Sequence, residues 1–301
     1  MYDSVGICLS THVDVRDYLP HFEEKINHKT GEISFVGYVG NFRVKKTVEF
    51  VSLYGSLSKY YFGDNFSTLS VNETKEAIEK LSNNLNLDLK GARIYRLDFG
   101  TNLILDHPVP QYLSRFGLLK YHKKSMYNDY QTVEYRNSLH EISCYDKSQE
   151  HKNKKIPIPD ALQGMHIAKI EERNKKRLAK RFQLPIITAA TLCNKNFFNL
   201  LIDNLVNGYF SINKHRVIKP VGSIKLNNVP SVRNYLAVVG LKYANINILD
   251  ILKTKEINKT PKSRIRAFIR ELITDKDITK EDSLIIEFNQ KIVEAVNKYR
   301  C

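Results

Sequence analysis

Polar and hydrophobic residues alternate along several short segments in the first 182 residues, and this period of two predicts β-strands. The segments with this pattern are 3–13, several runs within 32–63, 91–105, 131–137, 139–147 and 165–173. Two of them, 131–137 and 139–147, meet near Asn137 and Ser138, where turn-forming residues predict a hairpin. The first part of the chain is therefore predicted to build an antiparallel sheet.

A helical period of 3.6 residues marks other segments. At 70–89 Ser70 can cap the first turn, Glu73 completes a capping box and leucines line one face. Residues 14–27 favour a short helix with Asp14 as its N-cap. Past residue 185 the helical period dominates, in segments 187–209, 231–243, 260–276 and 282–299. We predict an α+β fold with a sheet domain at 1–185 and a mostly helical accessory, DNA-binding region at 186–301.

The charge balance narrows the classes of partner. Lys and Arg number 47 against 32 Asp and Glu, a net charge of +15. Residues 152–181 hold ten Lys or Arg and three acids, so part of the excess is clustered. Such clustering indicates a polyanionic partner and favours nucleic acid over an anionic membrane. A generally basic surface that keeps the protein soluble is the alternative explanation. The 17 tyrosines include several beside lysines, as single-strand binders have, while Tyr54 and Tyr95 read as core residues.

Several classes of site are disfavoured by motifs that the sequence lacks. Four scattered cysteines without CxxC spacing argue against a disulfide framework or a zinc site and fit a reducing compartment. Glycine-rich phosphate loops and paired-histidine metal motifs are missing as well. The chain shows neither a signal-peptide pattern nor a stretch apolar enough to cross a bilayer, so we expect a cytoplasmic protein without a membrane partner.

Charged residues on two predicted strands are candidates for chemistry. In 91–105, alternation places Asp98 on the same face as Arg96. In 165–173, Glu171 shares a face with Lys169 and Arg173. An ion pair at a strand end would also explain the first pair, and a solvated charged strand end the second group. These carboxylates become informative only together with a third segment.

That third segment is CYDKSQE, in which Tyr145, Lys147 and Glu150 have the spacing YxKxxE. Tyr145 and Lys147 lie two residues apart, so on a strand they point from the same face. A phenol beside an ammonium and a following basic run would suit attack on a phosphate. Alone, the pattern is short enough to arise by chance.

Taken in order, these segments resemble the replication initiators of the filamentous-phage gene II family, and more distantly the rolling-circle initiators of staphylococcal plasmids and their mobilisation relatives. The matching stretches are MYDSVGICLS (1–10), SLSKYYFGDNF (56–66), IYRLDFGTNLILDHP (94–108), HEISCYDKSQE (140–150) and AKIEERNKKRLAKRFQLP (168–185). The family tends to have Arg where Lys169 stands, and some members have His where Asp64 stands. The resemblance implies a nicking and joining enzyme on a ferredoxin-like, HUH-related antiparallel sheet.

The residues support this chemistry in their own right. Breaking a DNA strand while conserving the bond energy requires a covalent intermediate, and Tyr145 is the candidate nucleophile. A phenol has a pKa of about 10, so the charge of Lys147 would favour the phenoxide. Asp98 and Glu171 are the candidate metal ligands, and their hard oxygens favour Mg²⁺ or Mn²⁺ over zinc. The candidate DNA-binding cations are Lys152, Lys154, Lys155, Lys169, Arg173, Lys175, Lys176 and Arg177.

The sequence thus predicts a rolling-circle initiator that nicks and rejoins single-stranded or supercoiled origin DNA through a 5′-phosphotyrosine, with host helicase and polymerase as further partners. A relaxase for conjugative mobilisation would use the same chemistry. A non-catalytic DNA-binding protein would account for the charge and the tyrosines but not for the ordered Asp98, Tyr145 and Glu171. Tyr127, Tyr130 and Tyr135 are candidates for a second nucleophile.

Overall fold

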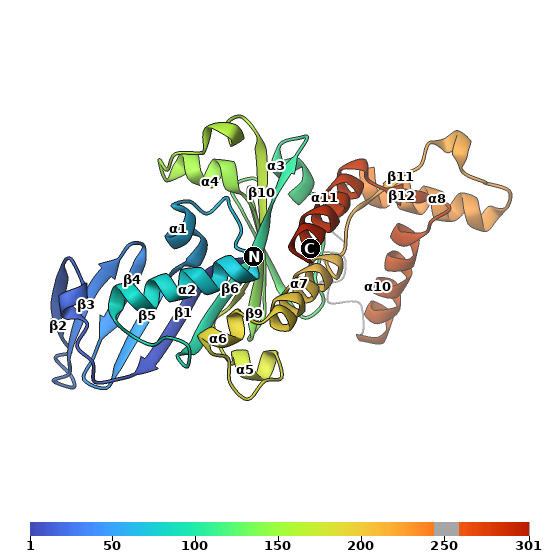
Figure 1. Cartoon of the computed structure of the whole chain (residues 1–301). Coiled ribbons are helices and arrows are strands. Elements are labelled where there is room, and N and C mark those ends of the chain that lie inside the picture. The colour runs from blue at the N-terminus through green and yellow to red at the C-terminus, as the bar shows by residue number, and fades with distance from the viewer. Residues whose placement is uncertain (244–258, 301) are drawn as a thin grey trace. The chain divides into compact units, whose positions relative to one another are not determined.

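A computed structural model describes residues 1–243 and 259–300 (Figure 1). Within these residues ten strands form one antiparallel sheet in the order β2-β3-β4-β5-β1-β6-β10-β9-β8-β7. Its strands are β1 (Tyr2–Ser10), β2 (Phe22–Ile26), β3 (Ile33–Val39), β4 (Phe42–Lys46), β5 (Phe50–Ser56), β6 (Arg93–Leu105), β7 (Lys123–Tyr127), β8 (Thr132–Arg136), β9 (His140–Asp146) and β10 (His166–Asn174). The α+β class is as predicted.

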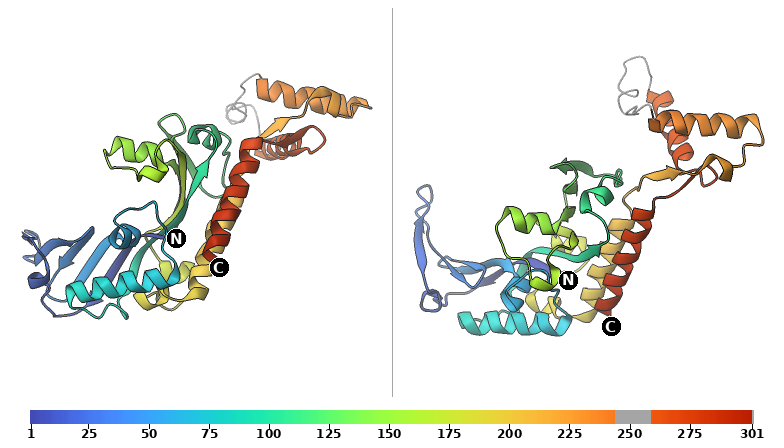
Figure 2. Two further views of the ribbon diagram at one scale, coloured as in Figure 1. Left: turned by 45° about the horizontal axis from the view of Figure 1, so that its top comes forward. Right: turned by 90° about the horizontal axis from the view of Figure 1, so that it is seen from above.

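The sheet separates an apolar face from a polar one, as alternation requires. On β9, for example, Ile142 and Cys144 alternate with Glu141, Ser143 and Tyr145. Helices that cover the apolar side include α2 (Val71–Leu85), α3 (Val109–Leu113) and α7 (Lys195–Phe210). Figure 1 shows α2 and α7 in front of the strands, and Figure 2 shows α2 along one side of β1, β4 and β5. The opposite side is left for polar residues.

Several elements form where local signals predicted them. α2 begins after Ser70 with the predicted capping box to Glu73. β8 and β9 form the predicted hairpin, and the Asn137 side chain accepts from the backbone N–H groups of Leu139 and His140. The predicted strands at 91–105 and 165–173 are β6 and β10. These segments fold as their own periodicity and turn residues dictate.

Two local predictions were wrong. Residues 14–27 form only a 3-10 turn, η1 (Arg16–Tyr18), followed by β2, because pairing with β3 recruits the second half of the segment into the sheet. The strand expected to include Lys147 ends at Asp146. The Asp146 carboxylate accepts from the backbone N–H of Gln149 and thereby starts α4 (Lys147–Asn153).

The chain divides into two compact units at a different place from the predicted boundary at 185. One unit comprises residues 1–213 and 288–301, and the other comprises residues 214–287. The sheet unit includes α6 (Ala189–Leu192), α7 and the latter part of α11 (Ser283–Arg300). The ring centroids of Phe198 in α7 and Tyr2 are 5.7 Å apart, and those of Phe197 and Phe182 are 5.5 Å apart. These helices belong with the sheet because they bury its aromatic residues.

The second unit pairs β11 (Arg216–Ile218) with β12 (Thr279–Glu281) and holds α8 (Val229–Tyr243) and α10 (Lys259–Thr274). Val238, Leu272 and Ile278 form its small core. The remaining described elements of the chain are α1 (Leu57–Phe62), α5 (Leu178–Arg181), η2 (Asp160–Leu162) and η3 (Val221–Ser223). Among the described residues no helix is long and apolar enough to span a membrane. Cys8, Cys144 and Cys193 are free thiols, and Cys301 lies outside the described residues.

Candidate active site

The register of β6, β10 and β9 brings Asp98, Glu171 and Tyr145 onto one face of three adjacent strands, whereas Lys147 lies beyond β9 at the start of α4. Glu171 of β10 lies opposite Gly100 of β6. Two residues further along β10, Arg173 lies opposite Asp98. On the other side of β10, Lys169 lies opposite Tyr145 of β9. Side chains at directly opposed and diagonal positions in an antiparallel ladder are within reach of one another, so the three strands build one polar cluster.

The two predicted metal-ligating carboxylates are buried and face arginines. Asp98 and Glu171 are each 3% exposed. Arg96 donates to Asp98 Oδ2 at 2.6 Å, while Asp98 Oδ1 is buried without a hydrogen-bond partner. Arg173 pairs with Glu171. Burial raises the pKa of both carboxyls above the ordinary value, although the arginines oppose the shift. Each carboxylate therefore gains by meeting additional positive charge.

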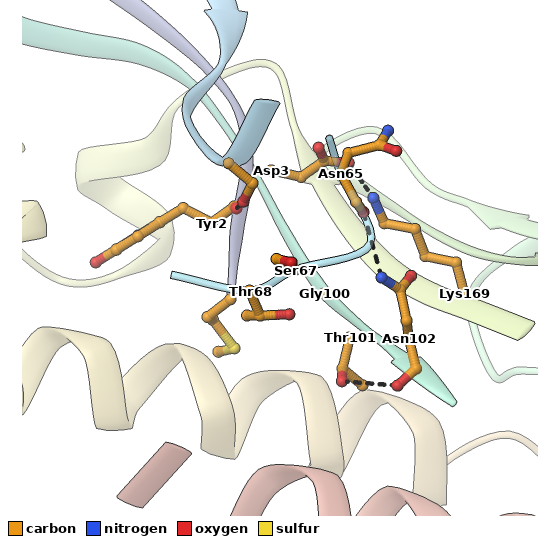
Figure 3. Close-up of a pocket in the computed structure, with 11 residues that line it drawn as sticks. Tyr2, Asp3, Asn65, Ser67, Thr68, Gly100, Thr101, Asn102 and Lys169 are labelled. Atoms are coloured by element: carbon orange, nitrogen blue, oxygen red, sulfur yellow. Dashed lines mark hydrogen bonds and ion pairs between the residues drawn. The ribbon is translucent and has the colours of Figure 1, made fainter. Parts of the chain in front are cut away.

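Asp3 is a third carboxylate at the site, and the sequence reasoning did not identify it. It lies on β1 and forms an ion pair with Lys169 (Figure 3). Glu171 approaches the same cation, because its Oε2 is 3.6 Å from Lys169 Nζ. Burial acts to raise the pKa of Asp3, but Lys169 outweighs it and holds the pKa well below its usual range. Of the two carboxyl groups, Glu171 therefore retains a proton more readily than Asp3.

Tyr145 is buried, although a nucleophile must be reached by its substrate. Its side chain is 8% exposed, and burial raises its pKa well above the ordinary value. The charge that most strongly opposes this shift is Lys169. Lys147 begins α4 with its Nζ 5.9 Å from the Tyr145 ring centroid and 2.9 Å from Glu150 Oε2. The positive charge directly across the ladder from the phenol is thus Lys169.

Gly100 makes the close approach of β6 to Glu171 possible. A Cβ atom at this position would lie 2.2 Å from the carbonyl oxygen of Ile170 and 2.7 Å from Glu171 Cα. Real Cβ atoms do not tolerate such distances, so any larger residue would separate β6 from β10. Glycine here keeps Asp98 and Glu171 on neighbouring strands within one cluster.

The sequence of the chain matches the model of one known protein family. The model of the Phage_CRI family, which describes the N-terminal part of a phage replication-associated protein, matches residues 5–193. The chain belongs to this family. The matched span holds Asp98, Tyr145 and Glu171, whereas Asp3 precedes it. No curated protein matches the chain.

Among solved structures, the di-domain ARO/CYC BexL from the BE-7585A biosynthetic pathway aligns with 63% of this chain and 77% of its own at 11% identity. The TM-score of 0.22 is too low to support any inference about this Phage_CRI protein. The family assignment therefore stands on the sequence model alone, and it agrees with the resemblance found in the sequence.

The predicted DNA-binding cations of this Phage_CRI protein fall into two groups. Lys152, Lys154, Lys155, Lys175, Lys176 and Arg177 are exposed. Lys154 also pairs with Glu150 at 2.6 Å. In contrast, Lys169 is 4% exposed and Arg173 lies between Glu171 and Glu141, whose Oε1 accepts from it at 2.6 Å. The first group is placed to meet phosphates at the surface, and the second is committed to the carboxylate cluster.

The three tyrosines considered as second nucleophiles have different surroundings. Tyr135 is fully buried, its hydroxyl donates to the carbonyl of Gly117 at 2.9 Å, and burial raises its pKa. It lies opposite Ile142 and so faces the apolar side. Tyr127 and Tyr130 are 44% and 36% exposed near the β7–β8 turn. Tyr135 is therefore a structural residue, whereas Tyr127 lies on the same face as Tyr145, two strands away through Thr132.

The donor set suits a hard cation better than a soft one. In the described part of the chain, no three His, Cys, Asp or Glu side chains are arranged as a ready-made metal site. Two carboxylates are still sufficient for Mg²⁺, which keeps several waters and takes other ligands from substrate phosphates. The unpartnered Asp98 Oδ1 fits this role because it is a buried oxygen without a donor. Asp98 and Glu171 thus fit such an ion, and thiolate or imidazole ligands are not part of the cluster.

Proposed function

We propose that this family member initiates rolling-circle DNA replication by nicking and rejoining one strand at an origin. The observation that carries the proposal is the cluster of Tyr145, Asp98 and Glu171 on one face of adjacent strands in a replication-associated family. We further infer that β1, β6, β10 and β9 correspond to the ferredoxin-like nuclease sheet. The partners would be origin DNA in single-stranded or supercoiled form and, downstream, host helicase and polymerase.

Tyr145 would be the nucleophile. Its hydroxyl oxygen bonds to the phosphorus of the scissile phosphate, the bond to the 3′-oxygen breaks, and a 5′-phosphotyrosine remains. The phenolic proton leaves to solvent, and the departing 3′-oxygen takes up a proton to become a free hydroxyl. In rejoining, a 3′-hydroxyl attacks the phosphotyrosine and Tyr145 departs as phenoxide. The bond energy is retained in both directions, so no external energy source is required.

Lys169 would assist both steps through its charge. It lies opposite Tyr145, so it stabilises the phenoxide before attack and after departure. Its ion pair with Asp3 fixes its position, and Glu171 Oε2 lies 3.6 Å from its Nζ. Lys147 adds positive charge on the α4 side of the ring. Because these side chains are buried, their charges act more strongly than they would in water.

Asp98 and Glu171 would hold Mg²⁺ or Mn²⁺. When bound, the cation supplies Lewis-acid polarisation of the phosphate oxygens. Arg96 and Arg173 orient the two carboxylates by pairing with one oxygen of each. The raised pKa of both carboxyls means that each must lose its proton before it can act as a ligand. We therefore expect cleavage to weaken as pH falls toward those values.

The decisive experiment is a covalent-adduct assay. The protein is incubated with supercoiled DNA of the cognate replicon and Mg²⁺, denatured with detergent and digested with nuclease. We expect nicked circles and a protein band that carries 5′-linked nucleotides on Tyr145, identified by peptide mass spectrometry. DNA binding without nicking or an adduct would support a non-catalytic DNA-binding protein instead.

A further inference from the structure

A row of aromatic and basic residues crosses the polar face of the sheet beside the carboxylate cluster. Tyr38 of β3 lies opposite Arg43 of β4, and Arg43 lies opposite Tyr54 of β5. Tyr54 in turn lies opposite Gly6 of β1, which lies opposite Arg96 of β6. We call these five residues the tyrosine row. They occupy one continuous line across five neighbouring strands.

Tyr38, Arg43 and Tyr54 of the tyrosine row are open to solvent, in contrast to the predicted core role of Tyr54. Tyr38 is 57% exposed and Tyr54 is 36% exposed. Arg43 is exposed as well. The alternate residues of the same strands, Val44 and Leu53 among them, are buried on the helix-covered side. Single exposed aromatic residues are common, but an in-register line of tyrosines and arginines is not produced by an amphipathic sheet alone.

Gly6 joins the two halves of the row. Because it has no side chain, the Arg96 guanidinium reaches across β1 and lies 4.9 Å from the centroid of the Tyr54 ring. A Cβ atom at Gly6 would come within 2.5 Å of the Tyr95 ring, which is 36% exposed and covers this position. Tyr95 was also predicted to be a core residue. The glycine thus leaves a shallow surface floored by aromatic rings.

The charge of this surface complements a polyanion, and its end coincides with the carboxylate cluster. Arg43 and Arg96 belong to the row itself, and Lys45 and Arg93 lie on the same face opposite Ser52 and Cys8. The row contains no carboxylate. Glu23 on the outer strand β2 is paired with Lys25 at 3.4 Å. Arg96 also binds Asp98, so the row runs directly into the cluster that holds Tyr145.

We propose that the tyrosine row binds the single-stranded DNA that adjoins the cleaved phosphate. Bases stack on Tyr38 and Tyr54, and Arg43 binds the phosphates between them. A single strand is the occupant because its base faces are free to stack, whereas a duplex hides them. The strand spacing of about 4.8 Å places the two tyrosines about 10 Å apart, so they contact separate nucleotides. This inference extends the proposed function by assigning a binding track to the same DNA strand.

The test measures binding without catalysis. A fluorescein-labelled oligothymidylate of about 20 nucleotides is titrated with full-length Tyr145→Phe protein, and anisotropy gives Kd. Tyr38→Leu and Tyr54→Leu are each expected to weaken binding about tenfold, while the Phe variants, which keep the ring, stay near the parent. Arg43→Gln should lower the slope of log Kd against log salt by about 0.7. Tyr121→Leu, at a tyrosine 83% exposed elsewhere, is the matched control and should change nothing.

The outcomes separate this inference from the proposed function. The proposal that the tyrosine row binds DNA would be wrong if the Leu and Phe variants bound the oligonucleotide equally well, or if Tyr121→Leu lost as much affinity as they do. That conclusion would hold even if the covalent adduct formed normally. An equal loss of affinity for a duplex of the same length would show that stacking is not involved. Self-association abolished by Tyr38→Leu would identify a second copy as the occupant. Conversely, the expected pattern of affinities would support the tyrosine row even if no covalent adduct were found. If Tyr54→Leu does not fold, Tyr38→Leu still tests the proposal.

Discussion

Lys169 on β10 and Tyr145 on β9 lie directly opposite each other, and the charge of Lys169 is the strongest influence opposing the burial that raises the pKa of Tyr145. Lys169 is itself buried. Its pKa is nevertheless raised, because Asp3, Tyr145 and Glu171 together outweigh the effect of burial. The ammonium therefore stays charged over the whole physiological range. A permanently charged group beside a buried phenol is what phenoxide formation requires.

Replacing Lys169 by Met should lower both stability and adduct formation. The change leaves Asp3 and Glu171 without their shared cation, and breaking a buried pair costs about 3 kcal/mol. Urea unfolding at pH 7 measures that loss. Lys169→Arg keeps the charge and should retain most of the stability. Lys147→Met, the comparison variant, should slow adduct formation less than Lys169→Met; the reverse order would assign the assisting charge to Lys147.

Tyr145→Phe should abolish the covalent adduct without weakening DNA binding. Only one hydroxyl is lost, so the free energy of unfolding should change by less than about 1 kcal/mol. Tyr135→Phe is the matched control, because it removes a hydroxyl that donates to the Gly117 carbonyl on the apolar side. That variant should lose about 1 kcal/mol of stability and keep the adduct. A Tyr145→Phe protein that still forms adduct would redirect attention to Tyr127 and Tyr130.

Mg²⁺ should stabilise the protein more at pH 8 than at pH 5. Asp98 and Glu171 have raised pKa values in the folded state, so folded protein binds protons more tightly than unfolded protein. Their contribution to stability therefore falls as pH rises from the ordinary carboxyl pKa through the raised one. A cation competes with those protons, so its binding strengthens over the same range.

Differential scanning fluorimetry measures this effect without DNA. At a Mg²⁺ concentration ten times Kd we expect about 1.4 kcal/mol of stabilisation at pH 8, equivalent to about 2–4 °C in Tm. Asp98→Asn and Glu171→Gln should each remove most of the shift and most of the cleavage. Identical Mg²⁺ shifts in the parent and in both variants would mean that these carboxylates serve only as arginine partners.

Local signals were sufficient to predict much of the sheet and part of the site. Asp98 and Glu171 were found because each lies on a predicted strand and the two stand in order with Tyr145, as in the gene II family, and the structure places both on one face. Asp3 was missed because its partner Lys169 lies 166 residues away in the sequence. Only the pairing of β6 with both β1 and β10 brings the two together, and no short-range pattern encodes that.

Burial was the least predictable property of the site. Tyr145, the candidate nucleophile that a phosphate must reach, is only 8% exposed, whereas Tyr54 and Tyr95 were expected to be core residues and are each 36% exposed. A strand's period of two shows which residues share a face, but not which face the helices cover. The side chains of Lys262, Arg266 and Arg270 in the basic segment 260–276 lie outside the described residues. The DNA-binding role predicted for residues 186–301 therefore stays a prediction.

A chain truncated after Pro185 should unfold or aggregate, since the helices that follow cover the sheet. Ile187 accepts from the backbone N–H of Ile94 at 2.8 Å, the hydroxyl of Tyr2 donates to the Leu192 carbonyl at 2.8 Å, and Phe198 packs on the Tyr2 ring. Removing them exposes large aromatic side chains to water, and losses of several kcal/mol exceed what a marginally stable domain tolerates. Circular dichroism and size-exclusion chromatography of the truncated protein test this. A soluble, cooperatively unfolding fragment that still forms the Tyr145 adduct would instead favour the domain boundary near residue 185 that the sequence predicts.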